Sequence, residues 1–203
     1  MAKLSVPPTK SSFLQIKRDL SFAKEGHELL EQKRQILVIE LMGQIEAARR
    51  VEMEVVEKMK AAFAALHKAL VDSGSLTMGS ESLASRGDQR IQVGERRLMG
   101  ITLSKVKAEH QKPGPQFGLG QGGAATDEVV KCFFEALEAI SRLAEVENAV
   151  FRLARELRKT QRRVNALDKI FIPDYSETLK YIESTLEERE REGMVVMRMV
   201  KRR

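Results

Sequence analysis

A glycine-rich stretch is the first feature of this chain whose residue types could do chemistry. The sequence GLGQGG at residues 118–123 invites comparison with loops that bind phosphate through backbone N–H groups. Such a loop follows a strand and usually leads into a lysine and a serine or threonine at the start of a helix. No Lys or Arg lies within these six residues. We therefore interpret the stretch as a linker and expect no nucleotide or other cofactor.

Three histidines and one cysteine are the other candidates for metal binding or nucleophilic catalysis. His27, His67 and His110 lie far apart in the sequence, and we find no ligand spacing around them that is typical of a metal site. We interpret them as structural or surface residues and Cys132 as a buried apolar residue. The protein is therefore not expected to be an enzyme.

The stretch TQRRVNALDKIFIPDY at residues 160–175 poses the main functional question. It could be a ligand site, a nucleic-acid patch or part of a long helix. The polar residues that could contact a ligand or a partner are Arg162, Arg163, Asn165 and Asp168. Val164, Leu167 and Phe171 follow the three-to-four spacing of an apolar helix face. Pro173 lacks the N–H that a helix needs, and its ring clashes with the carbonyl four residues earlier. We therefore predict a kink that costs about 3 kcal/mol.

The composition favours helices packed along narrow seams over a thick globular core. Hydrophobic residues make up 42% of the chain, charged residues 32% and aromatic residues only 5%, with no Trp. One cysteine excludes an internal disulfide and fits a reducing compartment. We recognise neither an apolar run long enough to span a bilayer nor a signal peptide, so we expect a cytoplasmic location.

The net charge of +6 is compatible with nucleic acid, an anionic membrane or an acidic protein as partner. Basic and acidic residues are interspersed along most of the chain, as on the solvated face of a helix. Only the last six residues, RMVKRR at 198–203, form a basic end. A free-standing coiled-coil scaffold or nucleic-acid-associated protein therefore stays the alternative function.

Glycine and proline positions divide the chain into two helical arms and an insert. Ten of the thirteen glycines lie within residues 74–123. Residues 10–72 and 126–200 are expected to be helical, and the segment between them is not. Thr9, Ser11 or Ser12 is expected to cap the first helix and Thr126 the second. The expected domains are an N-terminal arm (1–72), an insert (73–125) and a C-terminal arm (126–203).

Apolar residues recur along both arms at a spacing of three to four, which is typical of a coiled-coil seam. In the second arm the expected seam includes Phe133, Leu137, Ile140, Ala144, Glu147, Val150 or Phe151, Ala154, Leu157, Gln161 and Val164. Two such helices joined by an insert are expected to pack antiparallel. Equal helical rise predicts three facing pairs: Gly26 with Pro173, Arg34 with Val164, and Glu52 with Glu147. Phe13 should then lie near the last 25 residues.

The insert is expected to contain two short strands, near residues 89–93 and 99–107. Gly94 is expected at a turn or bulge and Gly100 at a bulge. We predict a small β-hairpin or paired-strand cap at the end opposite the chain termini. The fold class is therefore mainly α, a long antiparallel two-helix coiled coil with this small insert.

The sequence MVVMRMV at residues 194–200 is dense in apolar residues close to a terminus. The end of a two-helix hairpin offers little against which to bury them, so they indicate insertion into a partner protein.

Two motifs carry a resemblance to a known family. The first arm holds Pro-Thr-Lys at residues 8–10 and Gly-x-x-Leu-Leu-x-x-Lys at residues 26–33. The second holds Arg-Arg-Val-Asn-Ala-Leu, then Ile-Pro, and then YIESTLEERERE. Together they resemble the D subunits of the V-type (A/V-type) ATP synthases, in which Glu usually stands at the position of Asp168.

The resemblance implies a non-catalytic central rotor shaft of a V/A-type rotary ATPase or ATP synthase. The shaft would couple ATP hydrolysis or synthesis in a catalytic head to rotation of the membrane ring and to proton or sodium transport. The implied partners are the A and B subunits of the hexameric head, the small F subunit of the stalk and the funnel-shaped C subunit. The chain would be peripheral to the membrane, and neither nucleotide nor nucleic acid is an expected ligand.

The expected role gives three groups of candidate residues. The residues expected to contact the head are Lys10, Lys17, Arg162, Arg163, Asn165, Asp168, Met194, Met197, Arg198 and Lys201. Pro173 and Gly26 are expected to kink the shaft. The region expected to contact the other stalk subunits contains Arg90, Arg96, Arg97, Met99 and Ile101. No catalytic, cofactor-binding or metal-binding residue is expected.

Overall fold

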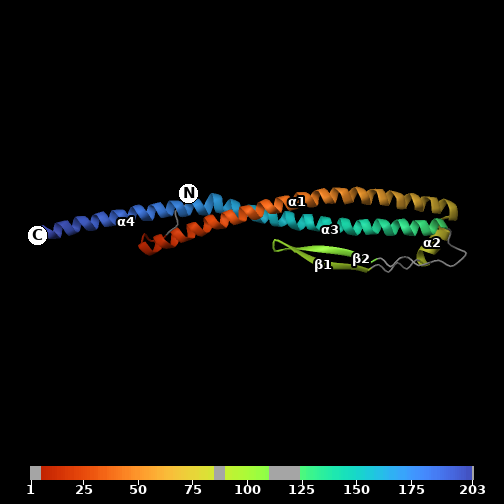
Figure 1. Ribbon diagram of the computed structural model, residues 1–203, viewed down its shortest axis with the longest axis horizontal. Coiled ribbons are helices and arrows are strands. Elements are labelled where there is room, and N and C mark those ends of the chain that lie inside the picture. Colours follow the sequence, from red (N-terminus) through yellow and green to blue (C-terminus); the bar gives the residue numbers. More distant parts are fainter. Residues whose placement is uncertain (1–5, 85–89, 110–123, 203) are drawn as a thin grey trace. The chain divides into compact units, whose positions relative to one another are not determined.

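The computed structural model describes residues 6–84, 90–109 and 124–202. The described chain is mainly helical, as predicted (Figure 1). Its elements are α1 (Lys10–Ser73), α2 (Ser75–Ala84), β1 (Arg90–Leu98), β2 (Ile101–Glu109), α3 (Ala124–Ala166), the π-helical turn η1 (Leu167–Phe171) and α4 (Ile172–Lys201). The chain forms two compact units, unit 1 from Met1–Val38 with Leu157–Arg203 and unit 2 from Ile39–Glu156. Each unit contains parts of both α1 and α3, and the predicted division into arms and insert stays a prediction.

The helix α1 begins at an N-cap that the sequence predicts. The side-chain oxygen of Thr9 accepts a hydrogen bond of 3.2 Å from the N–H of Ser12. The carbonyl of Thr9 accepts a bond of 2.9 Å from the N–H of Phe13. The cap satisfies an N–H group that the first turn of a helix leaves without a partner, so the helix starts at Lys10.

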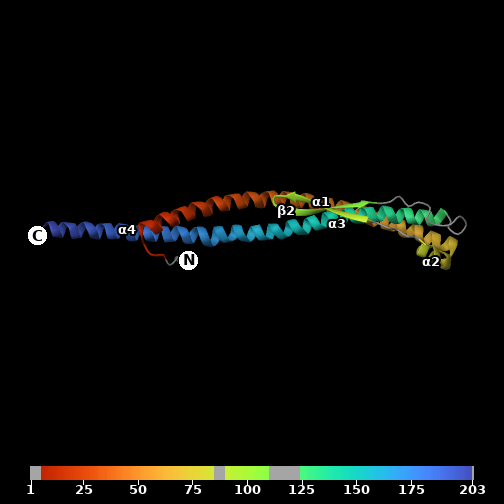
Figure 2. The same cartoon turned by 90° about the horizontal axis from the view of Figure 1, so that it is seen from below.

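In unit 1 the first half of α1 packs antiparallel against the end of α3 and against α4, and both views show α1 beside α4 (Figures 1 and 2). The buried apolar side chains come from both sides of this pair: Ile16, Ala23, Leu37, Val164 and Ile182. Removing this apolar surface from water is the main favourable contribution to packing. Thr178 is also buried, and its hydroxyl donates to the carbonyl of Asp174 at 2.7 Å, which satisfies it inside the helix pair.

The predicted antiparallel register is confirmed at the start of α1. The ammonium nitrogen of Lys10 lies 3.0 Å from a carboxylate oxygen of Glu190. Phe13 lines a groove together with Leu186, so it meets the last 25 residues of the chain as expected. The chain therefore folds back with its first helical turn beside α4.

The helix widens into one π-helical turn, η1, directly before Pro173. The N–H of Ile172 bonds to the carbonyl of Leu167, five residues earlier. In a regular α-helix the ring of Pro173 would clash with the carbonyl four residues earlier. A π-helical turn usually occurs as a single wider turn inside an α-helix, and helices are often kinked at such a turn. The chain stays helical through Pro173, and the bend predicted there stays a prediction.

In unit 2, α1 and α3 again pack antiparallel, along a seam of small side chains. Ala62, Ala136 and Ala139 are at most 1% exposed. Small residues at a helix contact allow the two helix axes to approach closely. The rings of Phe63 and Phe133 meet edge to face, with centroids 5.7 Å apart and an interplanar angle of 82°, a favourable aromatic geometry.

Charged side chains also join the two helices of unit 2. Glu52 and Glu147, predicted to face each other, are both exposed. The observed ion pair joins Glu54 to Arg142 at 2.7 Å, and Lys58 lies 3.1 Å from the same carboxylate oxygen. The register prediction is thus confirmed to within about a turn in unit 2, with a favourable pair in place of the expected like charges.

The buried face of α3 differs from the predicted seam in its middle. Of the two alternatives at one seam position, Val150 is half-buried and Phe151 is 75% exposed. Ile140 is 38% exposed, whereas Leu153 is fully buried and Thr160 is 4% exposed. Three further residues of the predicted seam are exposed: Ala144, Glu147 and Ala154. The prediction traced one apolar stripe for one partner helix. It was wrong here by one residue, since the buried side chains of Ala149, Leu153 and Thr160 recur at the same spacing one position before the predicted Val150, Ala154 and Gln161.

The short helix α2 corrects the expectation that the insert has no helix. Gly74, with φ of +77°, ends α1 in the left-handed conformation that glycine adopts easily. Its carbonyl accepts the N–H of Met78 at 3.2 Å, so α2 begins at once. Met78 is buried against Ala69 and Val129, and this contact stabilises a helix too short to be stable alone. Thr126 is a second correction, since it lies buried inside α3 and not at its N-cap.

The strands β1 and β2 form the predicted antiparallel hairpin; β1 is longer than expected, and β2 has the expected length but starts two residues later. All nine residues of each strand pair without a bulge. Gly94 pairs with Lys105 inside the ladder, so the prediction of a turn or bulge there was wrong. Met99 and Gly100, with φ of +50° and +79°, form the two-residue turn. Positive φ at both residues is the type I′ geometry whose twist suits a hairpin, so Gly100 makes a turn and not a bulge.

The hairpin lies against the middle of α3 within unit 2 (Figure 1). Glu145 accepts a hydrogen bond of 2.9 Å from the N–H of Val106, and Arg152 donates one of 2.7 Å to the carbonyl of Thr102. These bonds satisfy groups on the strand edge that a two-stranded sheet leaves unpaired. The buried side chains of β2 are Ile101 and Leu103. The hairpin is thus fixed to the side of a helix and is not a cap over a helix end.

Candidate partner-binding surface

The last turns of α4 expose an apolar run. Every residue in the range 187–202 is exposed. Because Glu190 pairs with Lys10, α4 continues for about three turns beyond the first residue of α1 (Figures 1 and 2). Met194 and Met197 are 53% and 68% exposed, and Val200 is 69% exposed. So much contiguous apolar surface is typical of a partner-binding site.

Arg198 and Lys201 lie on these same exposed turns, close to the end of α4. Basic side chains interact favourably with the partial negative charge at a helix C-terminus, so both also stabilise the helix locally. The end of α4 therefore combines apolar and cationic side chains, as the sequence suggests.

The two candidate lysines of α1 are both exposed. The side chain of Lys10 is 79% exposed although it pairs with Glu190. An exposed pair of this kind contributes little to stability and exchanges readily with other partners. Lys17 is exposed as well, so both lysines are available at the surface of unit 1.

The stretch at residues 160–175 places its charged residues outward. Arg162, Arg163 and Asp168 are exposed, and within the described part of the chain none has a hydrogen-bond or ion-pair partner. Asp168 lies in η1. The structure thus brings these three residues to one exposed stretch of unit 1, and their contact with a head stays a prediction.

A chain of polar contacts crosses the helix pair at the same stretch. Arg34 donates to Gln161 at 3.1 Å, one turn from Val164, its predicted partner. Glu31 holds Arg34 through both carboxylate oxygens, one at 2.9 Å from Nε. On the other side Gln161 donates to Asn165 at 2.9 Å. Sequence reasoning did not predict this bridge, and the signal it missed is that Arg34 and Gln161 are polar residues at seam positions.

The contact between Glu31 and Arg34 changes the acidity of both groups. The hydrogen bond from Arg34 is the main cause that lowers the pKa of Glu31, against the opposing effect of desolvation. The same hydrogen bond raises the pKa of Arg34. Both groups therefore stay charged over a wider pH range than in a free peptide, which favours the polar contact across the helices.

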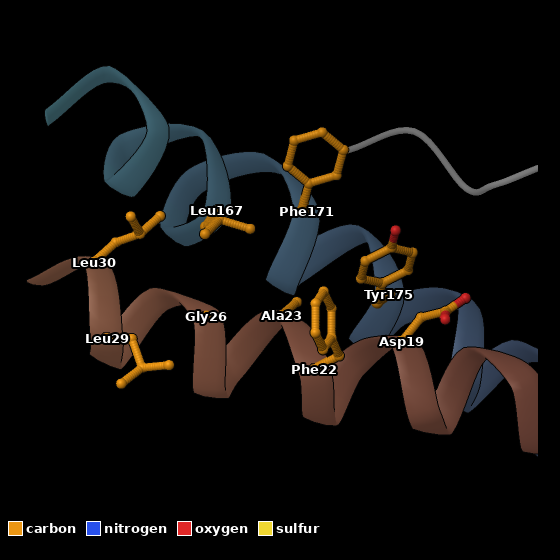
Figure 3. Close-up of a pocket in the computed structure, with 9 residues that line it drawn as sticks. All are labelled: Asp19, Phe22, Ala23, Gly26, Leu29, Leu30, Leu167, Phe171 and Tyr175. Carbon is orange, nitrogen blue, oxygen red and sulfur yellow. The ribbon is translucent and has the colours of Figure 1, made fainter. Parts of the chain in front are cut away.

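An apolar groove of about 650 Å³ lies in unit 1 between α1 and the segment formed by η1 and α4 (Figure 3). Its lining residues are Asp19, Phe22, Ala23, Gly26, Leu29, Leu30, Leu167, Phe171 and Tyr175. Gly26 thus faces residues on either side of Pro173, as the predicted register requires. The helix α1 runs unbroken through Gly26, and a kink there stays a prediction. Sequence reasoning missed the groove because Phe22 and Leu29 lie beside the expected seam of the first arm, which runs here through Leu20, Ala23, His27 and Leu30.

The candidate residues for the other stalk subunits lie on the hairpin and differ in exposure. Arg96 and Arg97 are exposed on β1, and Met99 is 44% exposed at the turn. Ile101 is 8% exposed, so its side chain packs inside unit 2 and is not available at the surface. The side chain of Arg90 lies outside the described residues.

Of the residues first considered for chemistry, His27, His67 and Cys132 lie in the described part of the chain. Cys132 and His27 are half-buried and His67 is exposed, while His110 and the glycine-rich stretch at residues 118–123 lie outside the described residues. In the described ranges, no three His, Cys, Asp or Glu residues lie close enough to hold a metal ion. None of the described helices is long and apolar enough to cross a membrane.

Paired helices with an exposed apolar end and an open groove are typical of a helical protein that contacts other proteins. A family model described as the D subunit of ATP synthase matches residues 12–202 of the chain. The chain belongs to this family of ATP synthase D subunits, as the two sequence motifs indicate.

Curated relatives agree with this assignment. The chain is 38% identical to the A-type ATP synthase D subunit of Thermococcus kodakarensis over 201 residues, 98% of this chain and 94% of the relative. It is 34% identical to the V-type ATP synthase D subunit of Thermotoga neapolitana, with 98% of each covered. It is 37% identical to a V-type ATP synthase D subunit of Treponema pallidum, with 99% and 96% covered. The chain is therefore a stalk subunit of a rotary ATPase.

Proposed function

We propose that this stalk subunit is the central rotor shaft, which couples ATP hydrolysis or synthesis in the catalytic head to rotation of the membrane ring and ion transport. The observation that carries the proposal is the exposed apolar and basic end of α4, in a chain of this family. Apolar side chains exposed over about three turns are typical of a surface that binds a partner. In this proposal the A and B subunits of the head are that partner.

The proposed shaft acts through contacts that differ around its circumference. Arg162 and Arg163 present positive charge, and Asp168 presents negative charge nearby along the same helix. Each A/B pair would meet a different side of the shaft at a given moment. Only a difference in contact energy can shift such a pair between open and closed states. Exposed charged contacts are screened by salt, so they give weak angular preferences and allow the shaft to turn.

The proposed contacts with the small F subunit and the funnel-shaped C subunit lie on unit 2. Arg96, Arg97 and Met99 are the exposed candidates on the hairpin, and hydrogen bonds from α3 hold the hairpin in place. The chain itself is proposed to have no active site. ATP hydrolysis by the purified chain alone would contradict that part of the proposal.

The proposal is tested by purifying the complex from native membranes through a tag on the A subunit, so that the shaft is not disturbed. The expected result is that this chain is recovered together with the B and F subunits. Met197→Asp places a charge in the apolar end and is expected to lower recovery of the chain with the head about tenfold. Glu192→Gln, at an exposed position of the same helix, is the control and should have no effect.

Absence of the unmodified chain from the purified complex would contradict the rotor assignment. Tight DNA binding by the chain with a steep salt dependence would instead support the alternative of a nucleic-acid-associated scaffold.

A further inference from the structure

The groove of unit 1 combines aromatic rings with a single carboxylate. Phe22, Phe171 and Tyr175 line it together with Asp19, the one charged side chain among its nine lining residues (Figure 3). Phe22 is 78% exposed and Phe171 47%, and the rings of Phe171 and Tyr175 lie 6.3 Å apart. A group that enters the groove therefore meets several aromatic rings and one negative charge.

Asp19 is half-buried in this apolar setting and has no partner. Within the described part of the chain it forms no hydrogen bond and no ion pair. Partial burial of a charged group is unfavourable unless another group pairs with it. A cationic group from outside the chain would therefore stabilise the carboxylate of Asp19, because the described residues do not supply one.

The backbone on both sides keeps the groove open. A Cβ added to Gly26 would meet no atom within 4 Å, so the α1 side has unfilled space. On the opposite side, η1 has no buried residue, so its side chains do not close over the groove. The space is thus available to a side chain from another protein.

We propose that this groove binds the guanidinium group of an arginine from the A/B head, which stacks on the aromatic rings and pairs with Asp19. The inference rests on the proposed rotor function, because that function places the head around unit 1. In a turning shaft with one such groove, the arginine of one A/B pair at a time enters it. The contact then favours one angular position per pair.

The chemistry of the groove selects arginine over other side chains. A guanidinium is planar, stacks on aromatic faces and donates two parallel hydrogen bonds to a carboxylate. Its apolar stem suits Leu29 and Leu30 on the same wall. A lysine ammonium is more strongly hydrated and cannot stack, and a purely apolar side chain would bury Asp19 without a partner.

The contact is tested in the assembled complex, purified through a tag on the A subunit. Phe22 is replaced by the photoreactive aromatic residue p-benzoylphenylalanine, and the cross-linked peptides are identified by mass spectrometry. The expected product joins the groove to a head segment that contains an arginine.

The energetic test compares Asp19→Asn with Glu28→Gln, an equal change of charge at an exposed residue of α1 outside the groove. Asp19→Asn is expected to speed dissociation of the shaft from the head about tenfold, and Glu28→Gln less than about twofold. Gly26→Met fills the groove with a flexible side chain that favours helix, so it should weaken binding without unfolding the chain. Gly43→Met, at another open helical glycine, is its control.

The outcomes separate this inference from the proposed function. It is overturned by a cross-link to a head segment without arginine, by a link to a second copy of this chain, or by no link to the head. It is also overturned by equal dissociation rates for Asp19→Asn and Glu28→Gln. In each of these cases the A and B subunits still co-purify with the chain, so the rotor function stands. If the unmodified chain does not co-purify with the head, both are wrong.

Discussion

Arg34 on α1 donates a hydrogen bond of 3.1 Å to Gln161 on α3, and this contact joins the two helices of unit 1. A neighbour one turn away fixes each end, Glu31 for the arginine and Asn165 for the glutamine. Polar residues at the seam of a coiled coil specify register, because a shifted pairing would leave them without partners. This chain of contacts therefore explains why the register deduced from helical rise holds in unit 1.

Gln161→Ala is expected to lower the melting temperature of the protein by about 2–4 °C. The substitution leaves a part-buried guanidinium nitrogen of Arg34 without its partner across the helices. Thermal unfolding followed by circular dichroism measures the effect. Gln32→Ala is the control, since Gln32 is exposed on α1 and has no such contact. Equal melting temperatures for the two variants would show that the bond does not contribute.

Glu54 makes the stability of unit 2 depend on pH. The hydrogen bond with Lys58 is the main cause that lowers the pKa of Glu54, and Arg142 adds to it against the opposing effect of desolvation. A carboxyl group with a lowered folded pKa stabilises the fold above its unfolded pKa, and this contribution is lost as pH falls through the folded pKa. Between about pH 6 and about pH 3 the wild-type melting temperature should thus fall more than that of Glu54→Gln.

Glu52→Gln is the matched control for this pH dependence, because Glu52 is exposed two residues away and has no ion pair in the described structure. Its melting curve should follow that of the wild type at every pH. Added salt should reduce the difference between Glu54→Gln and the wild type, because the pair is partly exposed. Parallel pH profiles for all three proteins at low salt would disprove the assignment.

Leu153 and Phe151 lie two residues apart on α3 and differ strongly in burial. Leu153 is 0% exposed and Phe151 75%. Leu153→Ala should lower the free energy of unfolding by about 2–4 kcal/mol, because it removes buried methyl groups and leaves a cavity. Phe151→Ala should change it by less than about 1 kcal/mol. Urea unfolding measures both, and a larger loss for Phe151→Ala would restore the seam deduced from the sequence.

The helix pair and its register could be predicted because many residues repeat the same signal. Apolar positions recur over dozens of residues, so an error at one position does not change the direction or pairing of the helices. The two strands likewise follow from alternating side chains, whereas the position of the turn at Met99 and Gly100 was not predicted. The N-cap at Thr9 could be predicted because it depends only on the next few residues.

The features that sequence reasoning missed depend on single contacts between distant residues. The helix α2 is stabilised by burial of Met78, and the hairpin is positioned by Glu145 and Arg152. None of these contacts leaves a periodic pattern in the sequence. Pro173 signals an irregular helix, but the preceding π turn and the groove beside it depend on the packing of α1 against η1 and α4. Asp19 and Phe22 therefore had no visible signal as a site.

Arg163 and Asp168 provide the sharpest test of the stretch at residues 160–175. Both are exposed and have no partner in the described chain, so losing them should leave the melting temperature within about 2 °C of the wild type. If the chain is the rotor shaft, the double variant Arg163→Ala with Asp168→Ala removes contacts that differ between orientations of the shaft. The number of ions transported per ATP hydrolysed by the reconstituted complex should then fall about twofold to tenfold.

The matched control is Glu46→Ala with Arg50→Ala, which removes the same two charges at exposed positions of α1 in unit 2. It should leave both stability and coupling unchanged. A loss of coupling confined to the first double variant assigns torque-bearing contacts to Arg163 and Asp168. Equal coupling in the two double variants would make the stretch an ordinary part of the coiled coil. The cross-helix contact of Gln161 with Arg34 would then be the main role of its polar residues.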